Sequence, residues 1–286
     1  MEQEYILKNV DSFEPKHIFE CGQCFRWNKN EDDSYTGIFG KNILTVKKEN
    51  YDVKFQGICE GDIQKICTQY FDLNTDYKKI KNELSMIDDY LKESINYGSG
   101  IRILNQDIWE MIISFIISAN NNIPRIKGII EKISRNYGKK IIYKNKEYYT
   151  FPTIEELSNA SVEDLRALGL GFRDRRVYDT TQIFLKGDMT IEELKNENNT
   201  EKLREKLLTL PGVGPKVADC IMLFSLKKYD VFPIDVWVRR VMNDLYIHNI
   251  DEEKVSKKEL QKLAKEKYSD LAGLAQQYLF YWKREA

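Results

Sequence analysis

Apolar and polar residues alternate in short runs along the first hundred residues, and turn residues separate the runs. This alternation is typical of strands in an antiparallel sheet that buries one face. Strands are expected at 25–27, 35–40, 43–46 and 51–55. Apolar residues at helical spacing follow at 61–70 and 76–92. The amino-terminal part is therefore predicted to combine an antiparallel sheet with helices.

Beyond residue 100 the pattern is almost entirely helical. Two glycines and a serine at 97–100 interrupt the periodicity and mark a domain boundary. Helices are expected at 107–119, 123–137, 153–159, 161–168, 172–185, 191–195, 200–210, 215–226, 236–246, 256–268 and 271–282, with a short strand pair within 140–151. The predicted fold class is α+β, an antiparallel sheet domain at 1–100 followed by a mainly α-helical region at 101–286.

The charges nearly cancel, because 44 Lys and Arg face 45 Asp and Glu for a net charge of −1. This balance gives no global sign of nucleic-acid binding, although a local basic patch can coexist with an acidic surface elsewhere. The only histidines, His17 and His248, lie far apart in the sequence. A multi-histidine metal site or a Ser/His/Asp triad is therefore poorly supported, and we expect any nucleophile to work without histidine.

The sequence contains no stretch expected to cross a membrane. The longest uncharged apolar run, 111–122, is shorter than the roughly 20 apolar residues that a spanning helix needs. The amino terminus is acidic where a secretory signal would be basic. We expect an intracellular protein of the cytoplasm or nucleoid, or of the nucleus in a eukaryote, with free thiols at its five cysteines.

Cys21 and Cys24 have the spacing of a redox pair, but they precede a strand-like run and do not begin a helix. A zinc site that adds Cys59 and Cys67 is a second alternative, and we favour neither.

The most informative segment is 207–235, with the sequence LLTLPGVGPKVADCIMLFSLKKYDVFPID. Gly212 and Gly214 permit a tight hairpin between helices, and Pro215 suits the first turn of the second helix. Such a hairpin leaves backbone N–H groups that can hold a phosphate. Two glycines alone would more often mean only a turn. Here Lys216 follows at once and Asp235 comes 19 residues later, which makes the combination specific.

Lys216 and Asp235 fit a definite chemistry. A sheltered amine can attack a sugar carbon and form a Schiff base, and a nearby carboxylate can stabilise positive charge on the ribose. The alternative for Lys216 is a solvated lysine in the first turn of its helix. The alternative for Asp235 is an N-cap for the helix that begins at 236, and Asp235 could both cap this helix and stabilise the ribose charge.

The segment 207–235 resembles the helix-hairpin-helix (HhH-GPD) glycosylase superfamily. Four further pieces narrow the resemblance. They are CGQCFRW at 21–27, FIISANNNIPRI at 115–126, LGLGFRDR at 168–175 and AGLAQQYLF at 272–280. Together with the hairpin they resemble the 8-oxoguanine DNA glycosylase/AP lyase family of the human type, over nearly the whole chain. The resemblance implies two helical subdomains, 118–228 and 101–117 with 229–286, and an active site in the cleft between them.

The resemblance also implies how the damaged base is held after it is flipped out of the duplex. The Gly22 carbonyl would accept a hydrogen bond from N7–H, which 8-oxoguanine has and guanine lacks. Cys220 and Phe280 would sandwich the base, Gln276 would read its Watson–Crick edge, and Pro233 would also contact the substrate. From the residues alone, Cys220 could instead be a small core residue, and Phe280 could belong to an ordinary buried helix face.

On the DNA side, the resemblance implies that Asn120 fills the vacated space and that Arg125 and Arg173 read the orphaned cytosine. Phe172 would be the wedge beside it, where the family has tyrosine. Trp237 stands where the family has a phosphate-contacting histidine. The residues implied to contact the DNA backbone at the hairpin are Gly212, Val213 and Gly214. Without the resemblance, 120–122 could be only a helix stop.

No cofactor is expected. Related enzymes with an iron–sulfur cluster carry four closely spaced cysteines near the carboxyl end, and no cysteine follows Cys220 here. The resemblance implies a structural cation at the hairpin, bound by the backbone of Leu208, Leu210 and Val213. The implied partner is double-stranded DNA containing 8-oxoguanine, bound by a monomer.

The predicted function is excision of 8-oxoguanine, preferably opposite cytosine, by attack of Lys216 at C1′, followed by β-elimination at the abasic site. One alternative is a glycosylase of the same superfamily that acts on other damaged bases. The other is a non-enzymatic protein that uses the hairpin to bind DNA structures.

Overall fold

A five-stranded antiparallel sheet forms the amino-terminal part of the computed structural model, which describes residues 2–249, 251 and 254–285. Residues 1 and 286, which end the predicted domain ranges, lie outside the described residues. The strands are β1 (Glu2–Leu7), β2 (Trp27–Lys29), β3 (Tyr35–Phe39), β4 (Asn42–Glu49) and β5 (Asp52–Ile58), in the order β1-β5-β4-β3-β2. The predicted strands at 35–40, 43–46 and 51–55 are confirmed, the first strand begins later than predicted, and β1 was not predicted.

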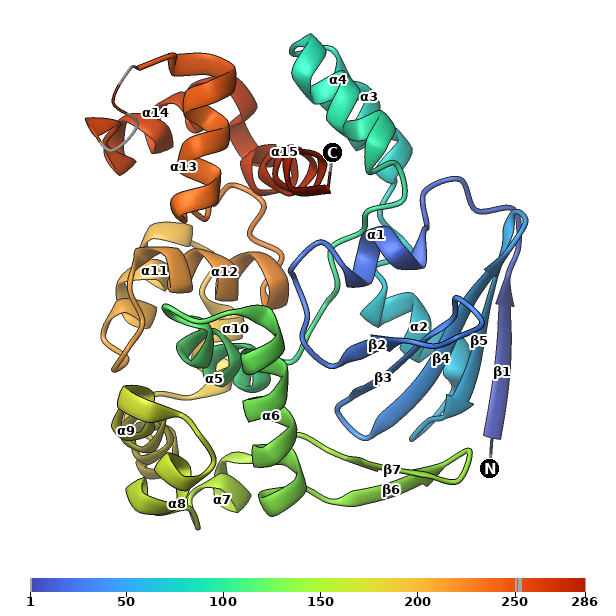
Figure 1. The fold of residues 1–286 in the computed structure, drawn as a ribbon, viewed down its shortest axis with the longest axis vertical. Helices are drawn as coiled ribbons and strands as arrows, with labels where there is room; N and C mark the ends of the chain where they lie inside the picture. The colour runs from blue at the N-terminus through green and yellow to red at the C-terminus, as the bar shows by residue number, and fades with distance from the viewer. Residues whose placement is uncertain (1, 250, 252–253, 286) are drawn as a thin grey trace.

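Helices α1 (Pro15–Phe19) and α2 (Ile63–Tyr70) pack against the sheet (Figure 1). The core between these helices and the sheet is rich in aromatic rings. Phe19 and Trp27 stack there with their ring centroids 4.0 Å apart. Asp62 caps α2 by accepting a hydrogen bond from the Lys65 amide. This packing fixes the loop between α1 and β2, which carries the predicted recognition residue Gly22.

The predicted helix over 76–92 is wrong, because two helices occupy this region. They are α3 (Tyr77–Ser85) and α4 (Asp89–Tyr97). The break occurs because Asp88 caps a new helix, its side chain accepting from the Leu91 amide. Figure 1 shows the pair beside the carboxyl-terminal helix α15 (Ala272–Glu285), and the buried Leu91 and Ile95 belong to the core of the helical region.

The helical region surrounds α5 (Ile108–Ser118), in which every residue but the last is buried. The remaining elements confirm the predicted helices and the strand pair. They are α6 (Ile123–Tyr137), β6 (Lys140–Tyr143), β7 (Lys146–Tyr149), α7 (Ile154–Leu157), α8 (Val162–Ala167), the 3₁₀ turn at Gly171–Arg173, α9 (Asp174–Lys186), α10 (Ile191–Asn196), α11 (Thr200–Leu208), α12 (Pro215–Ser225), α13 (Val236–Met242), a π-helical turn at Asn243–Ile247, α14 (Lys257–Tyr268) and the 3₁₀ turn at Ser269–Leu271.

Hydrogen bonds from Arg102 tie the segment that leads into α5 to the amino-terminal part of the chain. Its guanidinium donates to the carbonyl oxygens of Ser12, Phe71, Asp72 and Thr75. A buried arginine bonded to this many carbonyls holds the connecting segment in one conformation. No helix within the described ranges has the length and apolar character to span a bilayer.

Candidate active site

The hairpin between α11 and α12 is tight because of Gly212. Its φ of +86° is in the left-handed region, and a Cβ there would lie 2.8 Å from Cδ of Arg176. Gly214 precedes Pro215 and provides no capping side chain for α12. Within the described residues, no side chain caps the first amides of α12, and nothing lies within 4 Å of a Cβ built at Gly214. Such an amide cluster at a helix start suits a phosphate oxygen.

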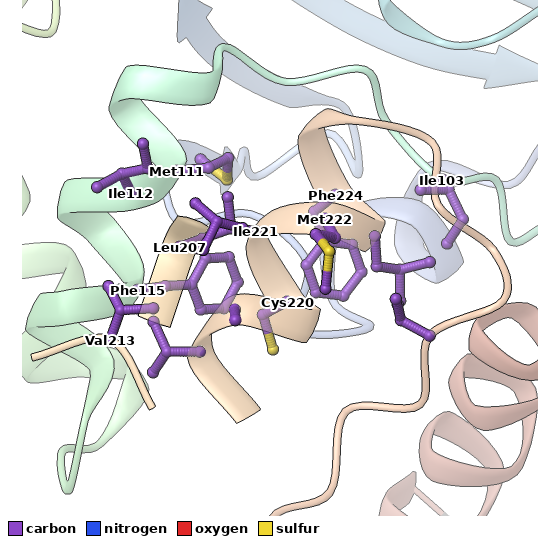
Figure 2. Packing of buried hydrophobic residues seen from close by; sticks show 14 of the residues in the cluster. Ile103, Met111, Ile112, Phe115, Leu207, Val213, Cys220, Ile221, Met222 and Phe224 are labelled. Atoms are coloured by element: carbon purple, nitrogen blue, oxygen red, sulfur yellow. The ribbon is translucent and has the colours of Figure 1, made fainter. Parts of the chain in front are cut away.

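Lys216 and Cys220 lie one turn apart on α12, as their spacing predicts. Lys216 is half-buried, and its ammonium lies 5.4 Å from the centroid of the Phe115 ring. Figure 2 shows Phe115 of α5 beside Cys220 of α12. Burial raises the pKa of the Cys220 thiol to about 11, the Lys216 charge opposes this rise, and Asp235 contributes to it. The Cys220 thiol is therefore within electrostatic reach of both Lys216 and Asp235.

Asp235 is the N-cap of α13. Its Oδ1 accepts a hydrogen bond from the Val238 amide at 2.8 Å, and its backbone is extended. Within the described residues, no group donates to Oδ2. The predicted capping role is confirmed, and the second oxygen leaves the carboxylate able to face a developing positive charge.

A small pocket between α13 and α15 lies beside Gln276 and Phe280. Its lining is Phe232, Val238, Val241, Met242, Gln276, Leu279 and Phe280. The cavity is about 10 Å³, room for about one water molecule. Gln276 is buried, and its Oε1 accepts from Nε2 of Gln277 at 2.8 Å. A purine does not fit until side chains of this pocket move. Pro233 is buried just before Asp235 and lies outside this lining.

Gly22 lies opposite Phe280, although the two come from opposite ends of the chain. A Cβ at Gly22 would lie 3.6 Å from Cε1 of Phe280. Gln23, which the sequence reasoning missed, fixes this loop. Its buried amide donates to the carbonyls of Ile18 and Arg102 and accepts from the Leu104 amide at 2.8 Å. A single glutamine in a loop gives no sequence signal of such burial.

Asn120 lies exposed in the turn after α5, with a φ of +51°. Arg173, in contrast, is 1% exposed. Its guanidinium donates to the carbonyl oxygens of Ala119, Asn120 and Leu170. In this conformation Arg173 therefore supports the Asn120 turn, and its donors are not directed toward a base. Sequence spacing gave no indication of this arrangement.

Arg125 and Phe172 lie on the surface near Asn120. Arg125 donates to the Gly169 carbonyl at 3.2 Å and is otherwise exposed. The Phe172 ring is 55% exposed, and the guanidinium of Arg173 lies 4.2 Å from its centroid. Both side chains thus lie at the surface beside the Asn120 turn, where the resemblance expects contact with DNA. Trp237 is also exposed, at the start of α13.

Asp219 and Arg204 form a buried ion pair that joins α12 to α11, with Nε and Oδ1 2.8 Å apart. Burial raises the pKa of Asp219 to about 6, and Arg204 opposes the rise. The sequence reasoning did not single out this pair, because its members are 15 positions apart on separate helices. The pair links the two helices of the hairpin directly.

The cysteines are free thiols, as expected. Cys21 and Cys24 are buried, and burial raises the pKa of both thiols, that of Cys21 to about 11. Reactive thiols need exposure and a lowered pKa, so the redox interpretation gains no support. Within residues 2–249, 251 and 254–285, no group of three His, Cys, Asp or Glu side chains could hold a metal ion.

Comparison with known proteins agrees with this geometry. Residues 113–266 match the family of HhH-GPD superfamily base excision DNA repair proteins. Residues 5–112 match the amino-terminal domain of 8-oxoguanine DNA glycosylase. The first match defines the class of protein, a helix-hairpin-helix base excision repair protein.

Individual relatives narrow the class. The chain is 33% identical to a probable N-glycosylase/DNA lyase of Methanothermobacter thermautotrophicus, over 76% of this chain and 73% of the relative. It is 30% identical to the N-glycosylase/DNA lyase OGG1 of Arabidopsis thaliana, over 92% and 75% of the two chains. The apo crystal structure of the Clostridium acetobutylicum 8-oxoguanine glycosylase/lyase is 45% identical, with a TM-score of 0.92 over 99% of this chain and 98% of that one. The chain therefore belongs to the 8-oxoguanine DNA glycosylase/lyase family.

Proposed function

We propose that this protein excises 8-oxoguanine from double-stranded DNA and then cleaves the strand at the abasic site. The observation that carries the proposal is the meeting of two groups of residues. The Cys220 thiol lies within electrostatic reach of both Lys216 and Asp235, and Gly22 faces Phe280 beside the pocket lined by Gln276 and Phe280. The Clostridium enzyme, solved with double-stranded DNA containing cytosine opposite 8-oxoguanine, has the same fold with a TM-score of 0.93 at 45% identity.

In the proposed reaction, Nζ of Lys216 attacks C1′ as the free amine. The bond from C1′ to the base breaks, its electron pair leaves with the base, and a proton from the amine ends on the departing base. Asp235 stabilises the positive charge on the ribose while this happens. The C1′–O4′ bond then breaks, its electron pair goes to O4′, which takes a proton from water, and a protonated Schiff base forms at C1′. Water accepts a proton from C2′, the C2′–C3′ double bond forms, and the 3′ phosphate leaves with the electron pair of the C3′–O bond.

Recognition of the damaged base is assigned to Gly22, Cys220, Gln276, Phe280 and Pro233. The Gly22 carbonyl would accept from N7–H, so guanine, which lacks that hydrogen, would leave a buried acceptor unpaired. The nearly filled pocket supports a two-step entry in which Phe280 first moves and then stacks on the base.

Opposite the lesion, Asn120 fills the vacated space, Phe172 wedges beside it and Arg125 reads cytosine. Arg173 contacts the cytosine only after its hydrogen bonds to the carbonyls of Ala119 and Asn120 break. The amides of Gly212, Val213 and Gly214 hold the DNA backbone. In this proposal the protein acts on DNA inside the cell, and it acts as a monomer.

The proposed cation at the hairpin has two unpaired carbonyls to bind it. Within the described residues, no backbone amide donates to the carbonyls of Leu208 or Val213, whereas that of Leu210 accepts from the Val213 amide at 3.1 Å. Carbonyl oxygens suit a hard cation. Such an ion would steady the hairpin against a phosphate, and Lys216 and Asp235 would perform the chemistry without it. No other cofactor is proposed.

The test is release of free base from duplexes that carry 8-oxoguanine or guanine opposite each of the four bases. We expect release of 8-oxoguanine, fastest opposite cytosine, and none of guanine. Equal release of the two bases would contradict the assignment of Gly22. A glycosylase for other damaged bases would leave 8-oxoguanine in place, and a non-enzymatic DNA-binding protein would release nothing.

A further inference from the structure

Arg284, near the end of α15, lies beside the base pocket, and none of the roles above involves it. Its side chain is 19% exposed. One Nη donates a hydrogen bond to the Glu20 carbonyl, and Nε donates to the Glu285 carboxylate at 2.9 Å. The guanidinium carbon lies 5.1 Å from the centroid of the Phe280 ring and 5.9 Å from that of Tyr281. One side chain thus joins the loop after α1 to the ring that flanks the pocket.

Gly22 is the third group at this point. Its φ is +87°, and a Cβ on it would lie 3.5 Å from the second Nη of Arg284 and 3.6 Å from Cε1 of Phe280. Arg284 therefore lies next to both parts of the proposed base-recognition site, the Cβ position of Gly22 and the ring of Phe280. A guanidinium suits this place because it donates in a fixed planar fork and also stacks on aromatic rings.

The loop on the other side of this bridge is anchored to the sheet. The Glu20 carboxylate accepts a hydrogen bond from the hydroxyl of Tyr35 on β3 at 2.5 Å. The connection therefore runs from the sheet through Glu20 and Arg284 to Phe280 on α15, and Figure 1 shows α15 across from α1. These elements are far apart in the sequence, so their relative position depends on contacts of this kind.

We propose that Arg284 is a positioning residue for recognition of the damaged base, one that sets the position of the Gly22 carbonyl relative to the Phe280 ring. This rests on the proposed function. A hydrogen bond from the base to Gly22 and stacking on Phe280 must be satisfied together, and hydrogen bonds weaken steeply when distance or angle departs from the optimum. Loss of the bridge would let the two halves of the site drift apart without removing any group that performs chemistry.

The test compares two DNA duplexes under single-turnover conditions, one with 8-oxoguanine opposite cytosine and one with a preformed abasic site opposite cytosine. Both reactions need Lys216 and the DNA contacts, but only the first needs the base pocket. We expect Arg284→Ala to slow base release about tenfold or more, while cleavage of the abasic duplex stays within about twofold of wild type. Arg284→Lys keeps a cation and one donor and should restore part of the lost rate.

The matched control is Lys283→Ala, the neighbouring position on α15, whose ammonium pairs with Asp244 at 2.9 Å, away from Gly22. It should leave both reactions unchanged. Wild-type base release by Arg284→Ala would overturn the inference. The inference would also be overturned if Arg284→Ala slowed base release and cleavage of the abasic duplex equally, or if Arg284→Lys restored none of the lost rate of base release. Failure of the wild-type protein to release 8-oxoguanine would instead refute the proposed function.

Discussion

Asp235 combines two tasks within one carboxylate. Oδ1 caps α13 through the Val238 amide, while the charge is proposed to face the ribose. Asparagine caps helices about as well as aspartate but carries no charge. The two tasks can therefore be separated by substitution.

We expect Asp235→Asn to keep the free energy of unfolding within about 0.5 kcal/mol of wild type and to slow base release by about 100-fold or more. Asp235→Ala should slow it similarly and also lower the free energy of unfolding by about 1 kcal/mol. Urea unfolding and single-turnover base release measure the two effects. An asparagine variant with the wild-type rate would show that the charge is not used.

Arg125 is the residue proposed to read the opposite base, and it is already exposed. We expect Arg125→Ala to slow excision opposite cytosine about tenfold, because one good bidentate contact to a base provides about 1–3 kcal/mol of discrimination. Excision opposite the other bases should change less. Lys132→Ala, two turns along the exposed face of α6, is the control and should retain the cytosine preference. Full cytosine preference in Arg125→Ala would assign the reading to another group.

At the scale of elements, the hairpin depends on the backbone of Gly212. A side chain at this position meets both a left-handed φ and the side chain of Arg176. Gly128, in the middle of α6, has no atom within 4 Å of its Cβ position. The same substitution at the two glycines should therefore have opposite effects.

We expect Gly212→Ala to lower the free energy of unfolding by about 1–2 kcal/mol and to weaken binding of duplex DNA. Gly128→Ala should raise the free energy of unfolding by about 0.5–1 kcal/mol, because alanine favours a helix interior. Chemical unfolding and DNA titration measure these changes. Equal stability of the two variants would argue that the hairpin adapts to a side chain.

Periodicity and turn residues were enough to predict most elements, including the hairpin and the β6–β7 pair. These signals did not predict β1 or the break between α3 and α4. β1 is a polar edge strand whose residues alternate between exposed and half-buried positions, so it lacks the apolar signal. At the break between α3 and α4, the Asp88 carboxylate accepts one capping hydrogen bond from the Leu91 amide, and a continuous helical pattern conceals this bond.

At the scale of the whole molecule, the site depends on contacts between distant segments. The resemblance named Gly22 and Phe280, and the structure brings them together. Sequence reasoning did not identify Gln23, Arg102 or Arg284, because the importance of each comes from backbone carbonyls that only the fold brings near. Nor could it show that Arg173 is buried against the Asn120 turn.

Glu110 is a buried carboxyl in the first turn of α5, close to Arg26 at the junction with the sheet. Burial raises its pKa to about 7, Arg26 opposes the rise, and Asp107 adds to it. Because the folded-state pKa is above the ordinary value, folding favours the protonated form. The resulting stabilisation is fully present below the ordinary pKa of 4.5 and is lost as the pH rises through about 7.

We expect this group to make the wild-type protein lose on the order of 3 kcal/mol of unfolding free energy between pH 4.5 and pH 8. Glu110→Gln removes the titrating group and should show a correspondingly flatter profile. Urea unfolding of both proteins across this range isolates the contribution as their difference. Parallel profiles would show that folding does not shift the pKa of Glu110.

The net charge of −1 shows how little a whole-chain average says about a local surface. The DNA contacts proposed here come from hairpin amides and from Arg125 beside the Asn120 turn. Neither histidine takes part in the proposed mechanism, since Lys216 supplies the nucleophile and Asp235 the charge.

The most direct test of the central claim is borohydride trapping on a duplex with 8-oxoguanine opposite cytosine. Reduction of a Schiff base joins enzyme and DNA permanently, so the adduct reports the amine that attacked C1′. We predict a covalent adduct with the wild-type protein, attached at Lys216, and none with Lys216→Gln. Undiminished trapping by Lys216→Gln would contradict the assignment of the nucleophile.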